Sequence, residues 1–366
     1  MPSASRPSIH RFTGFSLALA TILASSAAAG IALGASSPAG AATRGPAAPL
    51  GTTFSIAGSL YGVAATSAGN AWAVGAGARG TLILHWNGKT WSRVPSPALA
   101  DSSLSGVAAT SARSAWAVGF YYSGSDDKTL IVHWNGKTWT RVTSPAPVGG
   151  SLSSVTAISA TDAWAVGSVG TSSTRTLVMH WNGKTWARVS SPALAYSYLS
   201  SVAATSPSSA WAAGSTGAVP ESLVLRWNGK TWTRVPPEAV DTFATGVAAA
   251  SAGNAWMIGG DNGAPPTPWL LHWNGTTWKL AATAGGYSTL NGVAAVSARS
   301  AWAVGGNFNT GKLISMHWNG TRWKQLPTPG TGELTAVAAP PGGMAWAVGY
   351  TGRKTLILRL NGTTWS

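Results

Sequence analysis

The chain has 366 residues and a formal net charge of +15, with 24 basic, nine acidic and no cysteine side chains. Without cysteine, disulfides, thiolate metal sites, cysteine catalysis and a lipid-modified N-terminal cysteine are excluded. Glycine occurs 45 times and tryptophan 21 times, whereas charged residues make up only 9% of the chain. Disordered chains are poor in aromatic residues, so this composition indicates a packed structure with many turns.

Residues 1–42 have the pattern of a secretory signal peptide. Arg6 and Arg11 form a basic start, residues 15–35 are apolar, and Ala39-Gly40-Ala41 offers small residues for cleavage. Because the apolar stretch is rich in alanine, serine and glycine, cleavage is favoured over a retained membrane anchor at 15–35. We therefore expect a secreted protein with a linker at 43–50 and no membrane span. Losing the two arginines leaves 22 basic and nine acidic residues, a net charge of +13.

Seven copies of one unit follow. Each contains a run of small residues, a version of the motif A-W-A-V-G, a variable loop, a version of the motif L-x-x-H-W-N-G-K-T-W and, in most copies, a tail such as R-V-x-S-P. The first tryptophan recurs every 44 to 48 residues, at Trp72, Trp116, Trp164, Trp211, Trp256, Trp302 and Trp346. This period, with four strand-like pieces per unit, is typical of propeller blades. The sequence predicts an all-β, seven-bladed β-propeller over 51–366, with four antiparallel strands per blade and repeats at about 59–103, 104–151, 152–198, 199–244, 245–289, 290–333 and 334–366.

The second copy illustrates the expected strands, which we name a to d in chain order. They are predicted at 104–110, 115–120, 130–134 and 139–143. Strand a has small residues because the inner strands of all blades converge on a central channel. Tryptophans on strands b, c and d fill the wedge between diverging blades, each burying on the order of 150–250 Å². Between strands c and d, Asn135-Gly136 predicts a two-residue hairpin turn, with a four-residue N-G-K-T loop as the alternative.

The two ends of the chain are expected to meet. The last copy stops at Trp365-Ser366, where its strand d begins, whereas residues 52–57 are strand-like and precede strand a of the first copy. We expect residues 52–57 to complete the outer strand of blade 7, so that hydrogen bonds between the chain ends close the ring. Closure would remove an open sheet edge that otherwise invites aggregation.

Over residues 51–366 the chain resembles secreted bacterial propellers with repeated W-A-V-G and H-W-N-G-x-x-W motifs, which are loosely grouped with kelch-like and Asp-box propellers. The resemblance rests on residues 72–75 and 85–91 and their six counterparts. It implies a fold and little chemistry. Leu84 and Trp86 replace the Ser and Asp of an Asp-box, which weakens a link to sialidases. The cysteine-linked tyrosine of galactose oxidase, another kelch-like propeller, has no counterpart here.

Variation between the copies is concentrated in the b–c and d–a loops, which emerge on one face of a propeller. We name this the variable face; the short a–b and c–d turns form the opposite, constant face. Loops that vary on a constant scaffold usually carry binding specificity. We expect a glycan or cell-surface polymer to bind the variable face, although its rings could instead merely cover the blade tops. The candidate ligand-binding residues are Tyr121, Tyr122, Asp126, Asp127, Tyr196, Tyr198, Trp269, Phe308 and Tyr350.

No catalytic set is evident in the sequence. Five histidines occupy the same strand-c position in different blades, so symmetry keeps them apart and a structural role is favoured over a metal site. They are His85, His133, His180, His272 and His317. The remaining route to catalysis is a glycosidase-like carboxylate pair among Asp126, Asp127, Asp241 and Asp261. We predict a non-catalytic module without cofactor or metal; a polysaccharide-acting enzyme and a protein-interaction scaffold are the alternatives.

The constant face is predicted to be basic. Lysines stand in the c–d turns of blades 1 to 4 and arginines in two a–b turns, namely Lys89, Lys137, Lys184, Lys230, Arg113 and Arg299. Long-range attraction makes an anionic cell-envelope polymer or a protein a candidate partner, although solubility would also explain these charges. Nucleic acid is not expected, because the protein is exported and its tryptophans are needed for packing. We expect a monomer.

Overall fold

The computed structural model describes residues 54–366 apart from positions 98, 125, 146, 172, 193, 218, 238–241 and 363. The predicted signal peptide, the linker and Asp241 therefore lie outside the described residues. In the part of the chain that the structure describes, no helix has the length and hydrophobicity to cross a membrane.

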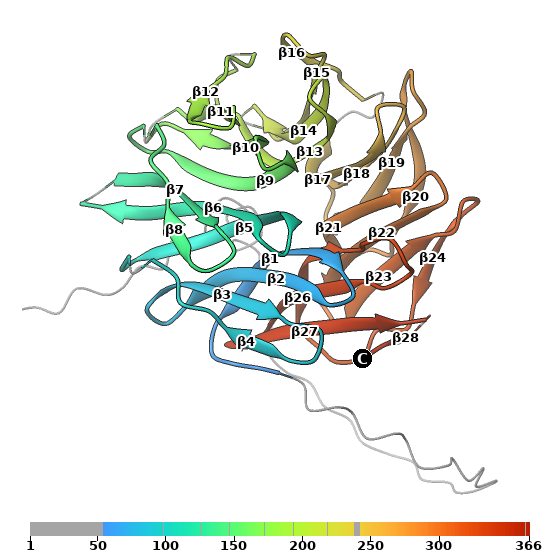
Figure 1. Ribbon diagram of the computed structural model, residues 1–366. Coiled ribbons are helices and arrows are strands. Elements are labelled where there is room, and N and C mark those ends of the chain that lie inside the picture. The colour runs from blue at the N-terminus through green and yellow to red at the C-terminus, as the bar shows by residue number, and fades with distance from the viewer. Residues whose placement is uncertain are drawn as a thin grey trace, which may run out of the picture. The chain divides into compact units, whose positions relative to one another are not determined.

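These residues form seven four-stranded antiparallel sheets, the blades of a β-propeller, with strands in chain order within each sheet (Figure 1). The inner strands a are β1 Ser59–Ser67, β5 Ser102–Ser111, β9 Ser151–Ser159, β13 Tyr198–Ser206, β17 Thr242–Ser251, β21 Ser288–Ser297 and β25 Glu333–Ala338. Strands b are β2 Asn70–Gly77, β6 Ser114–Ser123, β10 Asp162–Val169, β14 Ser209–Thr216, β18 Asn254–Asp261, β22 Ser300–Asn307 and β26 Trp346–Thr351. The predicted fold class is confirmed.

The outer half of each blade is made by strands c and d. Strands c are β3 Gly80–Trp86, β7 Asp126–Trp134, β11 Arg175–Trp181, β15 Glu221–Trp227, β19 Pro268–Trp273, β23 Leu313–Trp318 and β27 Lys354–Asn361. Strands d are short: β4 Trp91–Arg93, β8 Trp139–Arg141, β12 Trp186–Arg188, β16 Trp232–Arg234, β20 Trp278–Thr283, β24 Trp323–Leu326 and β28 Thr364–Trp365. Successive inner strands contact one another, and β25 contacts β1, so the ring is closed.

The two chain ends meet along β27, as the sequence predicted. The amide of Thr355 donates to the carbonyl of Ile56 at 2.9 Å, and the amide of Gly58 donates to the carbonyl of Arg353 at 2.9 Å. The other end of β27 pairs with β28. Residues 54–57 therefore continue the outer edge of blade 7 that β28 begins, although they form one isolated bridge, between Ala57 and Lys354, rather than a regular strand.

Clusters of three tryptophans join neighbouring blades. Trp164 of β10 is 1% exposed, and its ring contacts Trp227 and Trp232 of the next blade at centroid distances of 4.9 and 5.3 Å. The same triad recurs at five other junctions, around Trp72, Trp116, Trp211, Trp256 and Trp346. The predicted wedge of tryptophans is thus present, and each triad spans two sheets.

The glycine of each A-W-A-V-G motif is required by the close approach of strand a. A Cβ placed on Gly167 would lie 2.0 Å from the carbonyl oxygen of Ser151, and the equivalent distances in the other six blades are 1.8–2.1 Å. The a–b ladder shifts register beside this residue. Any side chain here would collide with backbone that has no room to move, which explains why every copy has glycine.

The c–d turn is a four-residue loop, so the two-residue hairpin prediction is wrong and its alternative is correct. Trp134 pairs with Trp139 across the loop. The Asn135 side-chain oxygen accepts the backbone N–H groups of Lys137 and Thr138, both at 2.9 Å, and Gly136 has a φ of 93°. Asparagine therefore satisfies the donors inside the loop, and glycine supplies the left-handed residue.

We predict that Trp164→Ala lowers the free energy of unfolding by about 3–5 kcal/mol, because it empties one triad. Leu280→Ala is the control: this side chain is 63% exposed, and its loss should change stability by less than about 0.5 kcal/mol. Urea unfolding followed by tryptophan fluorescence measures both. Equal stability of the two variants would show that the triads do not hold the blades together.

Candidate functional site

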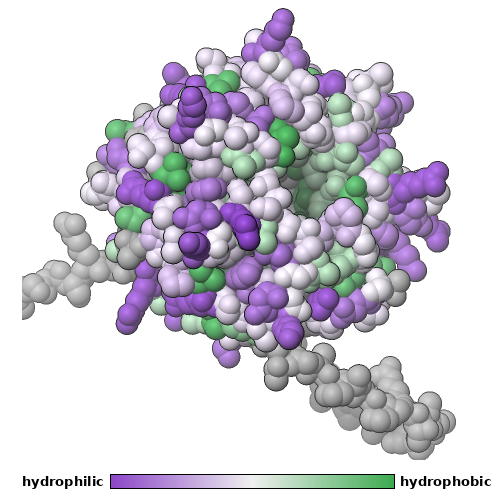
Figure 2. All heavy atoms as spheres, viewed as in Figure 1, coloured by the Kyte–Doolittle hydropathy of each residue, from purple (hydrophilic) through white to green (hydrophobic). Residues whose placement is uncertain are grey.

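Large apolar side chains are exposed mainly on the variable face. Seven are exposed among the described residues, and six of these lie in or beside b–c or d–a connections: Tyr122, Val148, Tyr196, Val219, Tyr287 and Phe308. The seventh, Leu280, lies on β20. The face seen in Figure 2 is hollowed near the middle of the ring, with hydrophobic residues in the wall of the hollow. Exposed apolar groups gathered on one side of a folded domain are typical of an interaction surface.

The blade 2 candidates lie on a β-hairpin rather than in a loop, because β6 and β7 extend further than predicted. Tyr121 is half-buried, and Arg141 lies 4.4 Å from its ring centre and donates to its hydroxyl at 2.6 Å. Tyr122 is 42% exposed and contacts the Phe120 ring edge-to-face at 5.5 Å. Tyr121 is thus held by its own blade, whereas Tyr122 is accessible to a ligand.

Asp126 and Asp127 are adjacent residues of β7, opposite Ser123 and Tyr122. Successive side chains of a strand point to opposite faces of the sheet, so these two carboxyl groups diverge. Asp261, another candidate acid, accepts the backbone N–H groups of Thr267 at 2.7 Å and Gly263 at 3.2 Å. Its carboxylate therefore organises its own b–c loop.

Two exposed tyrosines occupy left-handed backbone positions in the d–a turns. Tyr196 has a φ of 52° and is 56% exposed; Tyr287 has a φ of 61° and is 48% exposed. Each of these tyrosines lies three residues before the first leucine of strand a. The equivalent residues of blades 2 and 3, Asp101 and Gly149, are also left-handed, with φ of 49° and 68°. Bulky residues rarely adopt this conformation, which costs about 1–2 kcal/mol relative to the right-handed one. The sequence indicates Tyr196 as a candidate contact but not its left-handed conformation.

The left-handed residue of the d–a turn accepts a backbone hydrogen bond from the end of the following strand b. The carbonyl of Tyr287 accepts the amide of Phe308 at 3.0 Å, and the carbonyl of Asp101 accepts that of Tyr122 at 3.1 Å. The Phe308 ring, 45% exposed, consequently contacts the Tyr287 ring at 5.9 Å. An aromatic pair from two loops thus projects from blade 6. Tyr198, the first residue of β13, is half-buried beside its turn.

Tyr350 belongs to a polar cluster at the inner ends of blades 6 and 7. Its hydroxyl donates to Glu333, whose other carboxylate oxygen accepts the Asn291 amide at 2.9 Å. Burial, followed by the hydrogen bond to Glu333, raises the pKa of Tyr350 above its ordinary value of 10.0. The phenol therefore stays protonated at neutral pH. The sequence does not connect Asn291 with Glu333. Its only sign of the cluster is that Asn291 stands where other blades have Ser200, Thr245 or Thr335.

The expectation that Trp269 lies on the variable loops is wrong. It is a residue of β19, is 5% exposed and belongs to a hydrophobic core cluster. Trp269 pairs with Gly259 and takes the place of the leucine that begins the L-x-x-H-W motif in most copies. That alignment could have identified it as a core residue. The other candidates are spread over blades 2, 4, 6 and 7.

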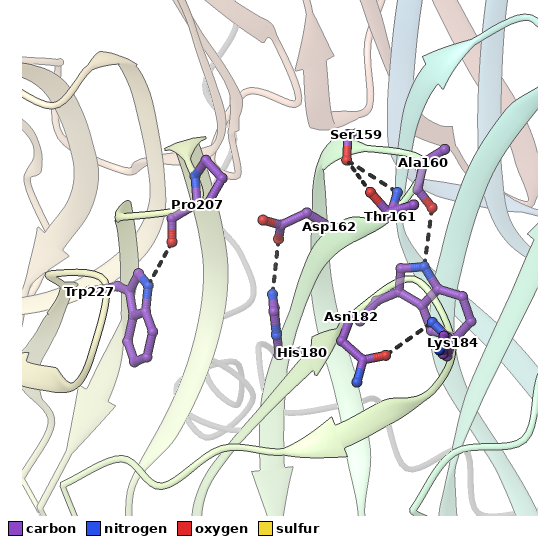
Figure 3. A network of polar contacts seen from close by, with 10 residues as sticks. Ser159, Ala160, Thr161, Asp162, His180, Asn182, Lys184, Pro207 and Trp227 are labelled. Atoms are coloured by element: carbon purple, nitrogen blue, oxygen red, sulfur yellow. Dashed lines mark hydrogen bonds and ion pairs between the residues drawn. The ribbon is translucent and has the colours of Figure 1, made fainter.

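The five strand-c histidines pack in the space between neighbouring blades, beside the tryptophans. Each ring lies 4.1–4.4 Å from the strand-b tryptophan of its own blade. His180 Nε2 and Asp162 Oδ1 are 3.0 Å apart, as Figure 3 shows. In blades 4 and 7, Arg226 and Arg359 lie over the equivalent tryptophans at 5.1 and 5.5 Å. Within the described residues, no three His, Cys, Asp or Glu side chains gather in a way that could hold a metal ion.

All six basic residues predicted for the constant face are exposed. Four of them lie in the c–d turns and two in the a–b turns, so they are distributed around blades 1 to 4 and blade 6. The positive side chains of this face are therefore concentrated on blades 1 to 4, while its aromatic side chains are turned inward into the triads.

No family model matches the sequence, and no curated protein matches it. Solved propeller structures do. YCF48 bound to D1 peptide is 15% identical over 85% of this chain and 98% of its own, with a TM-score of 0.56. The GH74 xyloglucanase from Xanthomonas campestris is 15% identical over 84% of this chain, with a TM-score of 0.61; the match covers 53% of the enzyme's chain. A PL25 ulvan lyase is 10% identical over 80% of this chain and 90% of its own, with a TM-score of 0.54. At such identities the similarity shows the fold alone.

Acid is predicted to weaken the fold through the wedge histidines. Burial holds the pKa of His85, His133, His272 and His317 below the ordinary 6.5. Below pH 6.5 the unfolded chain then binds more protons than the folded one, so stability present above that pH is lost as the pH falls through the folded pKa values.

His133→Gln should make this loss shallower, because glutamine does not titrate. Urea unfolding of both proteins at about pH 7.5 and about pH 5 measures the slope. An identical pH dependence in the variant would contradict the assignment of this effect to His133.

Proposed function

We propose that this protein is a non-catalytic extracellular binding module that recognises a glycan or cell-surface polymer through its variable face. One observation carries the proposal: six of the seven exposed large apolar side chains among the described residues lie in or beside b–c and d–a connections. Packing between blades does not require side chains there, since six of the seven junctions are filled by complete tryptophan triads, on the side of the constant face. Rings in shallow clusters with hydroxyl and amide neighbours provide the apolar faces and hydrogen bonds that a sugar polymer needs.

The left-handed tyrosines support a binding role. Gly149 shows that glycine fits this turn position, yet blades 4 and 6 place Tyr196 and Tyr287 there with φ of 52° and 61°. Strained backbone is retained where the side chain it presents has a use. The exposed hydroxyls and ring faces of these two residues are therefore the leading ligand contacts, together with Tyr122 and Phe308.

The solved propellers with a similar fold include proteins with polymeric partners. A xyloglucanase and an ulvan lyase bear the names of polysaccharides, and YCF48 was solved with a peptide. These names support an extended polymer as the ligand of this fold. The divergent Asp126 and Asp127 and the loop-bound Asp261 favour binding over carboxylate-pair catalysis in this chain.

The proposal is tested by applying purified residues 43–366 to an array of glycans and cell-wall polymers at two salt concentrations. Binding to particular neutral sugars that persists at high salt is the expected result. Binding only to anionic polymers that is lost at high salt would move the site to the basic constant face. A blank array would contradict the glycan proposal and favour a protein partner.

We predict that the double variant Tyr196→Gly and Tyr287→Gly folds with stability within about 1 kcal/mol of the parent, because relief of left-handed strain offsets the added freedom of the unfolded chain. Its affinity for the array ligand should fall at least about tenfold, equivalent to about 1.4 kcal/mol. Asp101→Gly is the matched control at the same turn position and should leave affinity unchanged. Full binding by the double variant would remove these tyrosines from the site.

A further inference from the structure

The junction of blades 6 and 7 departs from the other six. Trp302 of β22 contacts only one tryptophan of the next blade, Trp365, at 5.7 Å, because Leu360 stands where every other blade has the strand-c tryptophan. A pocket of about 260 Å³ opens here, lined by residues that include Trp302, His317, Leu326 and Met344. It lies on the constant face, among the a–b and c–d turns, and not on the variable face.

The six complete junctions show which group fits against the strand-b tryptophan in this position. The strand-c tryptophan lies 4.9–5.0 Å from the strand-b tryptophan of the preceding blade, with interplanar angles of 55–62°. In five blades its indole N–H donates to the carbonyl of the residue four positions before the strand-b tryptophan of its own blade. Figure 3 shows one such bond, from Trp227 to Pro207, at 3.0 Å.

On the blade 6 side, the pocket is lined by the same tryptophan–histidine pair that is present at most complete junctions. Trp302 is stacked on His317 at 4.1 Å and 26°, and Ser300 lies 3.3 Å from His317 Nε2. Trp302 is nevertheless 6% exposed, whereas the strand-b tryptophans of blades 1 to 5 are 0–1% exposed. Trp302 is thus slightly more exposed than these counterparts, and it lines the pocket.

The blade 7 side of the pocket is formed by its a–b turn. Gly342 stands four residues before Trp346, the position whose carbonyl accepts the indole N–H in five other blades, and has a φ of 112°. Pro340 and Pro341 have no amide hydrogen and cannot continue the ladder, so β25 ends at Ala338 and β26 begins only at Trp346. Pro340, Gly343 and Met344 line the pocket.

We propose that this pocket binds an indole ring from outside the chain, held against Trp302 and donating its N–H to the carbonyl of Gly342. The recognising chemistry is that of the internal junctions: the tilted aromatic contact present in all six and the indole hydrogen bond present in five. The ring is either a tryptophan side chain of a partner polypeptide or free indole. This site is independent of the ligand proposed for the variable face.

The wild-type protein contains its own control. In titrations with N-acetyl-tryptophanamide, the imidazole NMR signals of His317 should shift and saturate, whereas those of His272 should not move. His272 has the same place in blade 5, but its junction is filled by Trp318, whose ring lies 6.5 Å away. Unmoved His317 signals up to the solubility limit of the probe, or equal movement of both histidines, would overturn the proposal.

Leu360→Trp provides the second test, because six other copies fold with tryptophan at this position. The variant should unfold at a higher temperature than the parent, as the ring fills the pocket, and should lose the shift of His317. Retention of the wild-type shift in the folded variant would place the probe elsewhere and overturn the proposal.

Two further probes distinguish the sources. Tighter binding of the blocked tryptophan than of free indole indicates a polypeptide partner, and the reverse order indicates a small molecule; either result supports the pocket. With 1-methylindole, which lacks the N–H, affinity should fall several-fold, as for one hydrogen bond. Equal affinity of indole and 1-methylindole would overturn the assigned bond to Gly342.

Discussion

The structure depends on filling the wedge that opens between two sheets as they diverge from the ring centre. A strand-b tryptophan in one blade contacts the strand-c and strand-d tryptophans of the next, so the two sheets share one aromatic core. The requirement repeats at each junction, which explains why the motif recurs at nearly constant spacing. Near the axis the opposite constraint applies, and the glycine of W-A-V-G leaves room for strand a to approach. Because the blades diverge outward, close packing needs large side chains far from the axis and small ones near it.

These constraints require the residues of the constant face for packing, whereas those of the variable face can differ between blades. The a–b and c–d turns receive the indole N–H groups and contain the asparagine-capped loops, so their residues are used internally. The b–c and d–a connections differ between blades in length and side chains, and several d–a turns share only a backbone hydrogen bond to the end of the next strand b. Exposed aromatic residues accumulate there, including tyrosines in left-handed turns. The one irregular junction, at Leu360, is the place where the packing face itself offers a pocket.

Much of the fold could be predicted from the sequence, because the tryptophans and glycines that recur in each copy are the residues that pack the blades. The tryptophan period gave the blades, and the unfinished last copy with strand-like residues before the first one gave the closure along β27. Local hydrogen bonding was less accessible: Asn-Gly fits two turn types, and only the side-chain bonds of Asn135 decide between them. The blade 2 hairpin was also missed, since polar Asp126 and Asp127 resemble loop residues although they pair with Ser123 and Tyr122.

The candidate site was predicted less completely, because burial and backbone conformation are set by neighbours distant in the chain. The sequence favours a surface position for Trp269, but this side chain fills the leucine position against Gly259. The left-handed φ of Tyr196 and the cluster joining Asn291, Glu333 and Tyr350 depend on contacts between strands that the sequence does not order in space.

If the triads hold the ring together and the variable face is left for binding, the two sets of residues should differ sharply in their tolerance of substitution. A protease-resistance scan of all single substitutions, displayed and sorted for folded protein, measures that tolerance. The strand-b tryptophans and the W-A-V-G glycines should tolerate almost no replacement, whereas Tyr122, Tyr196, Tyr287 and Phe308 should tolerate nearly all. Intolerance at those four exposed rings, matched by tolerance at Trp164 and its equivalents, would contradict this expectation.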